Sequence, residues 1–103
     1  MGRPPKIKDV TDKVKTAAEA GNYRPTAHAF QRMNERDVDA TELDYVLRKG
    51  SHVGKHDEWK EEFQDWNYGF CGKTVDGKRI RLALAFAAEI LIVTVINEDL
   101  DDE

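Results

Sequence analysis

The spacing of apolar residues changes near residue 50, and this change limits the folds that the chain can adopt. Before it, apolar residues recur three or four positions apart, as in Leu43, Val46 and Leu47, which is typical of an amphipathic helix. After it, apolar and polar side chains alternate, most regularly over residues 79–86, as in a half-buried strand. Helices that precede strands favour an α+β fold over one built from repeated βαβ units.

Capping residues divide the first half of the chain into three predicted helices. The first covers about residues 9–20 and is closed by Gly21. Residues 24–26 then break the chain, because they contain a proline, and their last residue is a favourable N-cap for a second helix over residues 27–36. The third helix is predicted over residues 39–50, where a glycine ends it.

The second half is predicted to form an antiparallel sheet. The Asp76-Gly77 dipeptide favours a hairpin turn, so residues 69–73 should pair with residues 79–86. The latter should also pair with residues 90–96, and residues 51–63 have room for one or two short strands around a polar loop. The sequence therefore predicts an α+β fold in which two to three N-terminal helices pack on a three- to five-stranded antiparallel sheet.

The charges are unevenly distributed along the chain. There are 16 basic and 20 acidic residues, a net charge of −4, but five of the acids lie within the last six residues. Without those five, sixteen basic residues face fifteen acidic ones. We therefore expect an extended basic arm over residues 1–8, a single domain over residues 9–97 and an acidic, disordered tail over residues 98–103. The tail would screen the basic regions when no polyanion is bound.

The sequence also indicates a compartment and excludes some kinds of chemistry. No apolar run approaches the roughly 18 residues that a membrane span needs, and the N-terminus is not that of a signal peptide. The single cysteine, Cys71, excludes an internal disulfide and fits a reducing compartment. We therefore expect a cytoplasmic protein without a membrane partner. The spacing of histidine and cysteine predicts no metal site, and the absence of nucleotide fingerprints predicts no cofactor.

One helical segment carries the first candidates for chemistry. His28, Arg32 and Arg36 are four residues apart, so they lie along one face of the second predicted helix. Two neighbouring guanidinium groups favour a neutral imidazole, which can act as a base, and they can bind a phosphate. The alternative is structural: the arginines pair with Glu35 and other acids, and the histidine bonds to a loop carbonyl.

A second set of candidates lies in the predicted sheet. Arg79 and Arg81 share one face of a strand with small alanines, whereas large aliphatic residues fill the other face. An arginine in mid-sheet needs an anionic partner, which is either a carboxylate in an ion pair or a phosphate of a substrate. Tyr68 joins this set as a hydroxyl donor if its side chain is on the arginine face. Lys55 and His56 are further candidates for contact with RNA.

Together, these motifs resemble a known group of bacterial domains. The chain is similar, over about residues 26–97, to small domains of uncharacterised function that are allied to RelE-type and MqsR-type toxins. Their wider superfamily includes barnase, EndoU and the colicin nucleases. The resemblance is carried by the patterns His28-x-x-x-Arg32-Met33-x-Glu35-Arg36, Leu43-x-x-Val46-Leu47-x-x-Gly50, Trp66-x-Tyr68-x-x-x-Gly72 and Asp76-Gly77-x-x-Ile80-Arg81, with a final apolar strand over residues 92–96.

The resemblance implies a RelE-like fold and a toxin that cleaves messenger RNA, free or ribosome-bound, without a metal ion. The products would carry 2′,3′-cyclic phosphate and 5′-hydroxyl ends, and a cognate antitoxin would be the protein partner. The alternative is a non-catalytic module of the same fold that binds protein or nucleic acid. The predicted catalytic residues are His28, Arg32, Arg36, Arg81 and Tyr68, and the predicted RNA-binding residues are Arg79, Lys55 and His56.

Overall fold

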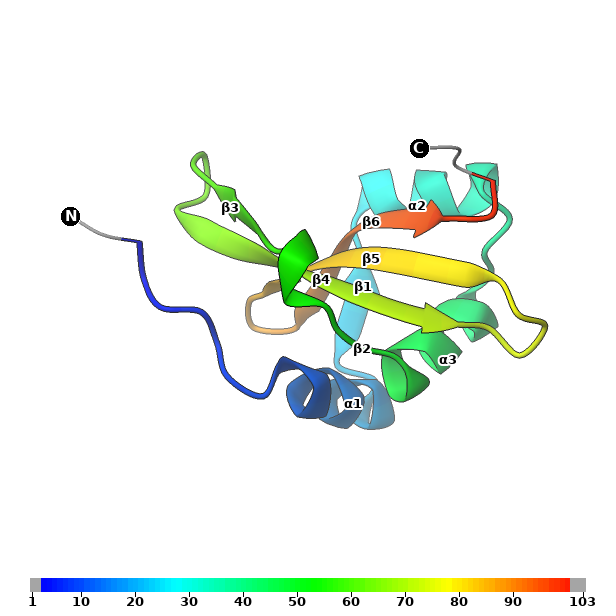
Figure 1. The fold of residues 1–103 in the computed structure, drawn as a ribbon, viewed down its shortest axis with the longest axis horizontal. Helices are drawn as coiled ribbons and strands as arrows, with labels where there is room; N and C mark the ends of the chain where they lie inside the picture. Colours follow the sequence, from blue (N-terminus) through cyan, green and yellow to red (C-terminus); the bar gives the residue numbers. More distant parts are fainter. Residues whose placement is uncertain (1–2, 101–103) are drawn as a thin grey trace.

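The helices of the computed structural model, which describes residues 3–100, lie where the sequence predicts them (Figure 1). They are α1 (Val10–Ala20), α2 (Ala27–Glu35) and α3 (Ala40–Lys49). The predicted caps are confirmed, because Gly21 follows α1 with a φ of 70° and the Thr26 hydroxyl accepts a hydrogen bond from the Ala29 N–H. At the start of α3, Asp39 and Glu42 form a reciprocal capping box.

The strands form one mixed sheet, in the order β1-β6-β5-β4-β2. The remaining strand, β3, pairs with the first three residues of β4. A short 3₁₀ turn, η1 (Gly54–His56), separates β2 from β3. The strands are β1 (Tyr23–Pro25), β2 (Ser51–His52), β3 (Glu58–Lys60), β4 (Asp65–Lys73), β5 (Arg79–Phe86) and β6 (Ile90–Asn97). The two short strands β2 and β3 confirm the expectation for residues 51–63.

Both predicted long pairings are confirmed. β4 and β5 are antiparallel with Lys73 opposite Arg79, and β5 and β6 are antiparallel with Arg81 opposite Ile96. The connection between β4 and β5 contains Gly77, whose φ of 89° is a conformation that favours glycine. An irregularity between Ala83 and Leu84 shifts the register of β5 against β6.

The prediction of a purely antiparallel sheet is wrong, because β1 pairs with β6 in parallel. Residues 24–26 were expected to interrupt the chain, yet Arg24 and Pro25 belong to this strand. Proline is tolerated there because β1 is an edge strand, where the missing N–H costs no ladder hydrogen bond. Thr26 extends the contact, since its N–H donates to the Ile92 carbonyl at 3.0 Å. With β1, the sheet has six strands rather than three to five.

The core lies on one face of the sheet, which therefore has two different faces. All three helices contribute buried apolar residues to the same core cluster as the long strands, and Leu84 of β5 is fully buried there. On β5, buried residues alternate with the partly exposed Arg81, Ala83 and Ala85. The outer face is thus lined by small and cationic side chains on β5, and no long helix belongs to it among residues 3–100.

The two ends of the described chain lie against the domain. Residues 3–8 form no helix or strand, and Figure 1 shows them passing beside the β3–β4 hairpin before α1 begins. At the other end, the Glu98 N–H donates to the Arg79 carbonyl, and residues 98–100 form a turn rather than the expected disordered tail. The rest of that predicted tail, residues 101–103, lies outside the described residues. Within residues 3–100, no helix is long and apolar enough to cross a membrane.

Candidate functional site: a cationic cavity on the outer face

A cavity of about 330 Å³ opens on the outer face of the sheet. One wall is the turn that contains η1, and its floor is formed by β5 and β6. The cationic groups in its lining are Lys55 and Arg81, and His56 is the one imidazole among the lining residues. The lining is Lys55, His56, Asp57, Glu58, Arg81, Leu82, Ala83, Thr94 and Ile96.

His56 and Arg81 are in contact inside this cavity. The Arg81 Nη1 atom lies 3.2 Å from Nδ1 and 3.4 Å from Nε2 of the imidazole. A guanidinium only donates hydrogen bonds, so the ring nitrogen that accepts from it carries no proton. The contact therefore places an imidazole next to a fixed cation that is 25 residues away in the sequence.

A glycine on β4 determines how closely the turn approaches the sheet. A Cβ atom added to Gly69 would lie 2.3 Å from the His56 Cβ and 2.9 Å from the Val53 carbonyl oxygen. Only a residue without a side chain leaves room for the turn at this position. Gly69 thus allows the backbone of η1 to rest on the sheet and brings the His56 ring within reach of Arg81.

A buried carboxylate fastens the same turn to β4. The Asp57 side chain is only 1% exposed and accepts hydrogen bonds from the Gly69 N–H at 2.9 Å and from the His52 Nε2 at 2.9 Å. It also forms an ion pair with Lys6 at 3.0 Å. Burial acts to raise the pKa of Asp57, but the Gly69, Lys6 and His52 contacts outweigh it and lower that pKa below its ordinary value.

Acidic residues at the end of β6 already contact the two strand arginines. Glu98 Oε2 lies 3.8 Å from Arg81 Nη1, and Asp99 accepts a hydrogen bond from Arg79 Nε at 2.9 Å. Arg79 therefore fits the alternative in which a strand arginine forms an ion pair with a carboxylate of the chain, here that of Asp99. Arg81 has a looser carboxylate contact and remains part of the cavity wall.

Three of the predicted residues come together in this cavity, namely Lys55, His56 and Arg81, whereas the predicted helical set does not line it. Arg32 pairs with Glu35 at 2.5 Å, as the structural alternative expected. Arg36 donates from Nη1 to the Val95 carbonyl at 2.7 Å, so it fastens the end of α2 to β6.

His28 is exposed on α2 and is not among the residues that line the cavity. Arg36 is the C-cap residue just beyond α2, and the helix face that carries His28 and Arg32 does not form a wall of this cavity.

Tyr68 does not meet the condition under which it was a candidate hydroxyl donor, because its side chain is not on the arginine face. Tyr68 is opposite Leu84 in the β4–β5 ladder, and it is buried on the core face with 1% exposure. Its hydroxyl accepts a hydrogen bond from the Ile7 N–H at 2.8 Å. Side chains two positions apart on a strand lie on the same face, so Tyr68 points into the core together with Phe70.

Sequence reasoning missed Asp57 and His52. Both were part of a polar segment without a clear period, and their importance follows from the pairing of β2 and β3 with β4. A possible signal was the isolated Gly69 within a strand, which often marks close approach of another backbone.

The sulfur of Cys71 offers no second chemistry on this face. Burial, together with the charge of Glu98, raises the pKa of its thiol. The thiolate, the reactive form, is therefore disfavoured at neutral pH. Among residues 3–100, no group of three or more histidine, cysteine, aspartate or glutamate side chains is arranged to hold a metal ion.

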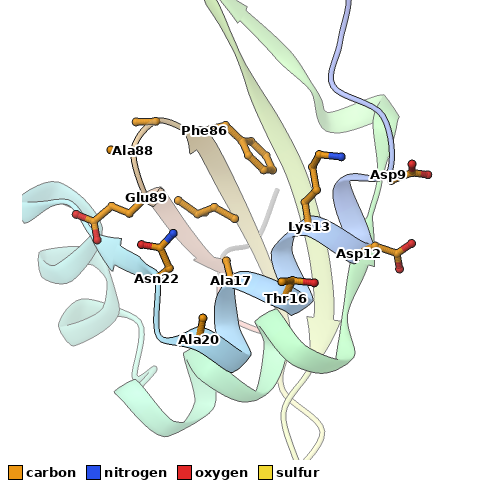
Figure 2. A pocket seen from close by; sticks show the side chains of 12 residues that line it. Asp9, Asp12, Lys13, Thr16, Ala17, Ala20, Asn22, Phe86, Ala88 and Glu89 are labelled. Atoms are coloured by element: carbon orange, nitrogen blue, oxygen red, sulfur yellow. The ribbon is translucent and has the colours of Figure 1, made fainter.

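A second cavity, of about 510 Å³, lies between α1 and the β5–β6 turn. Figure 2 shows Lys13, Thr16 and Ala17 on its helix side and Phe86 and Glu89 on its strand side. It contains no histidine or arginine among its lining residues. The outer-face cavity is therefore the better candidate for acid–base chemistry on an anionic substrate.

The fold and the cavity define a small mixed α+β domain with a cationic cavity on the open face of its sheet. The chain belongs to the domain family of unknown function DUF4258, which it matches over residues 26–97. This region runs from the N-cap of α2 to the end of β6, so it contains the whole cavity but neither the arm nor α1. No curated protein matches the chain.

Proposed function

We propose that the protein is an endoribonuclease that cleaves RNA at the outer-face cavity without using a metal ion. The observation that carries this proposal is the contact between His56 and Arg81, which pairs a proton acceptor with an anion-binding group. General base catalysis by one side chain adds about 10²–10⁴-fold to a rate. A well-placed donor to developing charge contributes about 2.7–4 kcal/mol.

In this mechanism, the substrate phosphate binds to Arg81 and displaces the imidazole from it. A phosphate is a stronger acceptor for a guanidinium than a neutral ring nitrogen, because both partners are charged. The nitrogen of His56 that is released then accepts the proton of a ribose 2′-hydroxyl. The 2′-oxygen attacks the adjacent phosphorus, and the bond to the 5′-oxygen breaks, which gives a 2′,3′-cyclic phosphate.

The departing 5′-oxygen needs a proton to leave as a hydroxyl. Lys55 is the second cation in the cavity lining and precedes His56 in the same turn, so its ammonium group supplies that proton. Arg81 keeps the phosphate in place while negative charge builds up on its oxygens. His56 is thus the base, Lys55 the acid and Arg81 the electrostatic group, in place of the helical residues that the motif suggested.

The test compares His56→Ala with His28→Ala in a cleavage assay on single-stranded RNA in the presence of EDTA. The His28 variant is a matched control, because it removes the same ring from an exposed position outside the cavity. We expect at least a hundredfold loss for His56→Ala and little change for His28→Ala. Equal activity of the two variants would refute the assignment of the base.

The same assay uses an all-2′-deoxy substrate to test the chemistry itself. Without a 2′-hydroxyl no internal nucleophile exists, so we expect no cleavage of this strand. Mass spectrometry of the RNA products should find 2′,3′-cyclic phosphate ends. Products with a 5′-phosphate would contradict the mechanism, because they require water as the attacking group.

The resemblance to RelE-type and MqsR-type toxins supports the same function. Within this proposal the fold is of the RelE type, and the protein is the toxin of a toxin–antitoxin pair that acts in the cytoplasm on messenger RNA. Expression of the intact chain should then arrest growth, and His56→Ala should relieve the arrest. A neighbouring gene whose product binds this chain and restores growth would identify the antitoxin.

One observation favours the alternative, a non-catalytic binding module. Most of the predicted cations already have partners within the chain, since Arg32 pairs with Glu35 and Arg79 with Asp99. A module that uses only Arg81 and Lys55 to hold a polyanion would bind RNA without cleaving it. Binding that resists the His56→Ala change, with no cleavage by the unaltered protein, is the expected result for that alternative.

A further inference from the structure

The arm that precedes α1 is held by two tryptophans of the β3–β4 hairpin. Trp59 and Trp66 form an edge-to-face pair, with ring centroids 5.5 Å apart and planes at 72°. The guanidinium carbon of Arg3 lies 5.3 Å from the Trp59 centroid and 5.6 Å from that of Trp66. Both distances are within the range of a cation–π interaction.

The arm backbone is recognised as well as its charges. The Trp66 indole N–H donates to the Pro4 carbonyl at 3.0 Å, and Lys6 Nζ lies 4.7 Å from the Trp66 centroid. Lys6 also forms the ion pair with Asp57 described above. An indole that binds a proline carbonyl and stacks on nearby cations is a mode suited to an extended segment with proline between two basic residues.

The surroundings of the tryptophan pair are acidic, which matches the charge of the arm. The β3–β4 hairpin carries four acidic residues, and Trp59 Nε1 donates to one of them, Glu61, at 3.1 Å. The arm contributes Arg3, Lys6 and Lys8. This surface therefore combines aromatic rings, an oriented donor and negative charge. Its contacts with the arm do not require the arm to be part of the same chain, so a separate peptide can make them too.

The arm is anchored just before α1 by Ile7, which packs against the core and donates its N–H to the Tyr68 hydroxyl at 2.8 Å. Asp9, the N-cap residue of α1, has a φ of 57° and makes no capping hydrogen bond with its side chain. Aspartate is one of the few residues with a Cβ atom that adopt this left-handed conformation as single residues. The contacts with the tryptophans come from Arg3, Pro4 and Lys6, so residues 3–6 can leave the site while Ile7 and α1 stay in place.

We propose that Trp59, Trp66 and Asp57 form a binding site for an extended cationic polypeptide segment that contains proline, supplied by a partner protein. Residues 3–6 of this chain occupy that site in cis. A tethered segment competes at high effective concentration, so a partner binds only where its own segment outcompetes the arm or the arm is displaced. This site shares Asp57 with the lining of the cavity of the proposed nuclease, but its test measures peptide binding and does not depend on RNA cleavage.

The experiment weakens the arm and offers the same sequence as a free peptide. The full chain carrying Arg3→Ser and Lys6→Ser keeps all site residues but removes the two arm cations that contact the tryptophans and Asp57. The probe is a synthetic peptide with the sequence of residues 3–8, titrated by calorimetry. We expect the double variant to bind this peptide at least tenfold more tightly than the unaltered protein, and not to bind a peptide with serine in place of the arginine and lysines.

A third change identifies the groups that recognise the peptide. Trp66→Ala in the double-variant background should weaken peptide binding about tenfold, which corresponds to the loss of one to two cation–π contacts and the indole hydrogen bond. Phe63→Ala is the matched control, because it removes an exposed aromatic ring from the same hairpin. Circular dichroism confirms that each variant is folded before binding is compared.

Three results would overturn the proposal. The first is a double variant that does not bind the peptide, and the second is a double variant that binds it equally well with and without Trp66. The third is a chain that dimerises through its arm in sedimentation while the peptide fails to compete. In that case the surface serves a second copy of this chain and not a partner protein.

Discussion

Gly69→Ala is the sharpest test of how the sheet positions the candidate site. The added methyl group would lie 2.3 Å from the His56 Cβ and 2.9 Å from the Val53 carbonyl oxygen. Ordinary van der Waals contact begins near 3.4 Å, so the turn must move outward by about 1 Å. The atoms in the way belong to the backbone and a Cβ, which no rotamer change can move.

This shift has a cost in stability and a cost in activity. Overpacking of this kind lowers the free energy of unfolding by about 1–3 kcal/mol, and each kcal/mol lowers the melting temperature of a domain this size by about 4–8 °C. A displacement of about 1 Å at a catalytic group costs about a hundredfold in rate. We therefore expect both a lower melting temperature and a much larger loss of RNA cleavage.

Gly54→Ala is the matched control, because it makes the same chemical change within η1. A Cβ atom at Gly54 meets only the Asp57 Oδ2 atom, at 4.0 Å, which is an ordinary contact. Thermal unfolding followed by circular dichroism gives the stability of both variants. Equal melting temperatures for the two alanine variants and the unaltered protein would refute the claim that the turn rests on β4 at Gly69.

Three further predictions test the core, the electrostatics and one perturbed group. Leu84→Asp should unfold the domain, since it buries an unpaired charge at a fully buried position, whereas Ala85→Asp on the outer face should remain folded by circular dichroism. Glu98→Gln removes the carboxylate 3.8 Å from Arg81, so RNA should bind more tightly in a filter-binding assay, most clearly at low salt; unchanged affinity would remove Glu98 as a competitor. Burial and the hydrogen bond to Asp44 raise the pKa of Tyr23 to about 12, above its ordinary value of 10.0, so the stability linked to it is complete below pH 10 and is lost as the pH rises toward 12. The ionisation of Tyr23 can be followed by the absorbance of tyrosinate, and Asp44→Asn should shift this titration to lower pH.

The order and kind of the main elements could be predicted from the sequence because local signals specify them. The Thr26 N-cap and the Gly21 C-cap satisfy backbone groups within a few residues of each helix end. The period of two over β5 likewise identifies which side chains share a face, and the structure confirms that Leu84 is buried and Arg81 is not. These are short-range properties that a single sequence displays directly.

Long-range contacts decided the remaining features of the fold. β1 is three residues long and contains Pro25, so its local preference is not that of a strand. It forms because β6 offers a free edge beside it, and the parallel direction follows from where the chain returns after α1. The face of Tyr68 was also decided by register, since a shift of one residue along β4 would have placed its side chain on the face that carries Arg81.

The candidate site divides in the same way. The sequence by itself identified Arg81 as a candidate for phosphate binding and Lys55 and His56 as candidates for contact with RNA, because charge and acid–base character belong to the side chain alone. It assigned the central role to the His28 helix, since residues four apart on one helix are the only neighbours that a sequence guarantees. Only the tertiary structure joined η1 to β5, through the space left by Gly69 and the buried Asp57 carboxylate, because such contacts depend on the pairing of strands far apart in the chain.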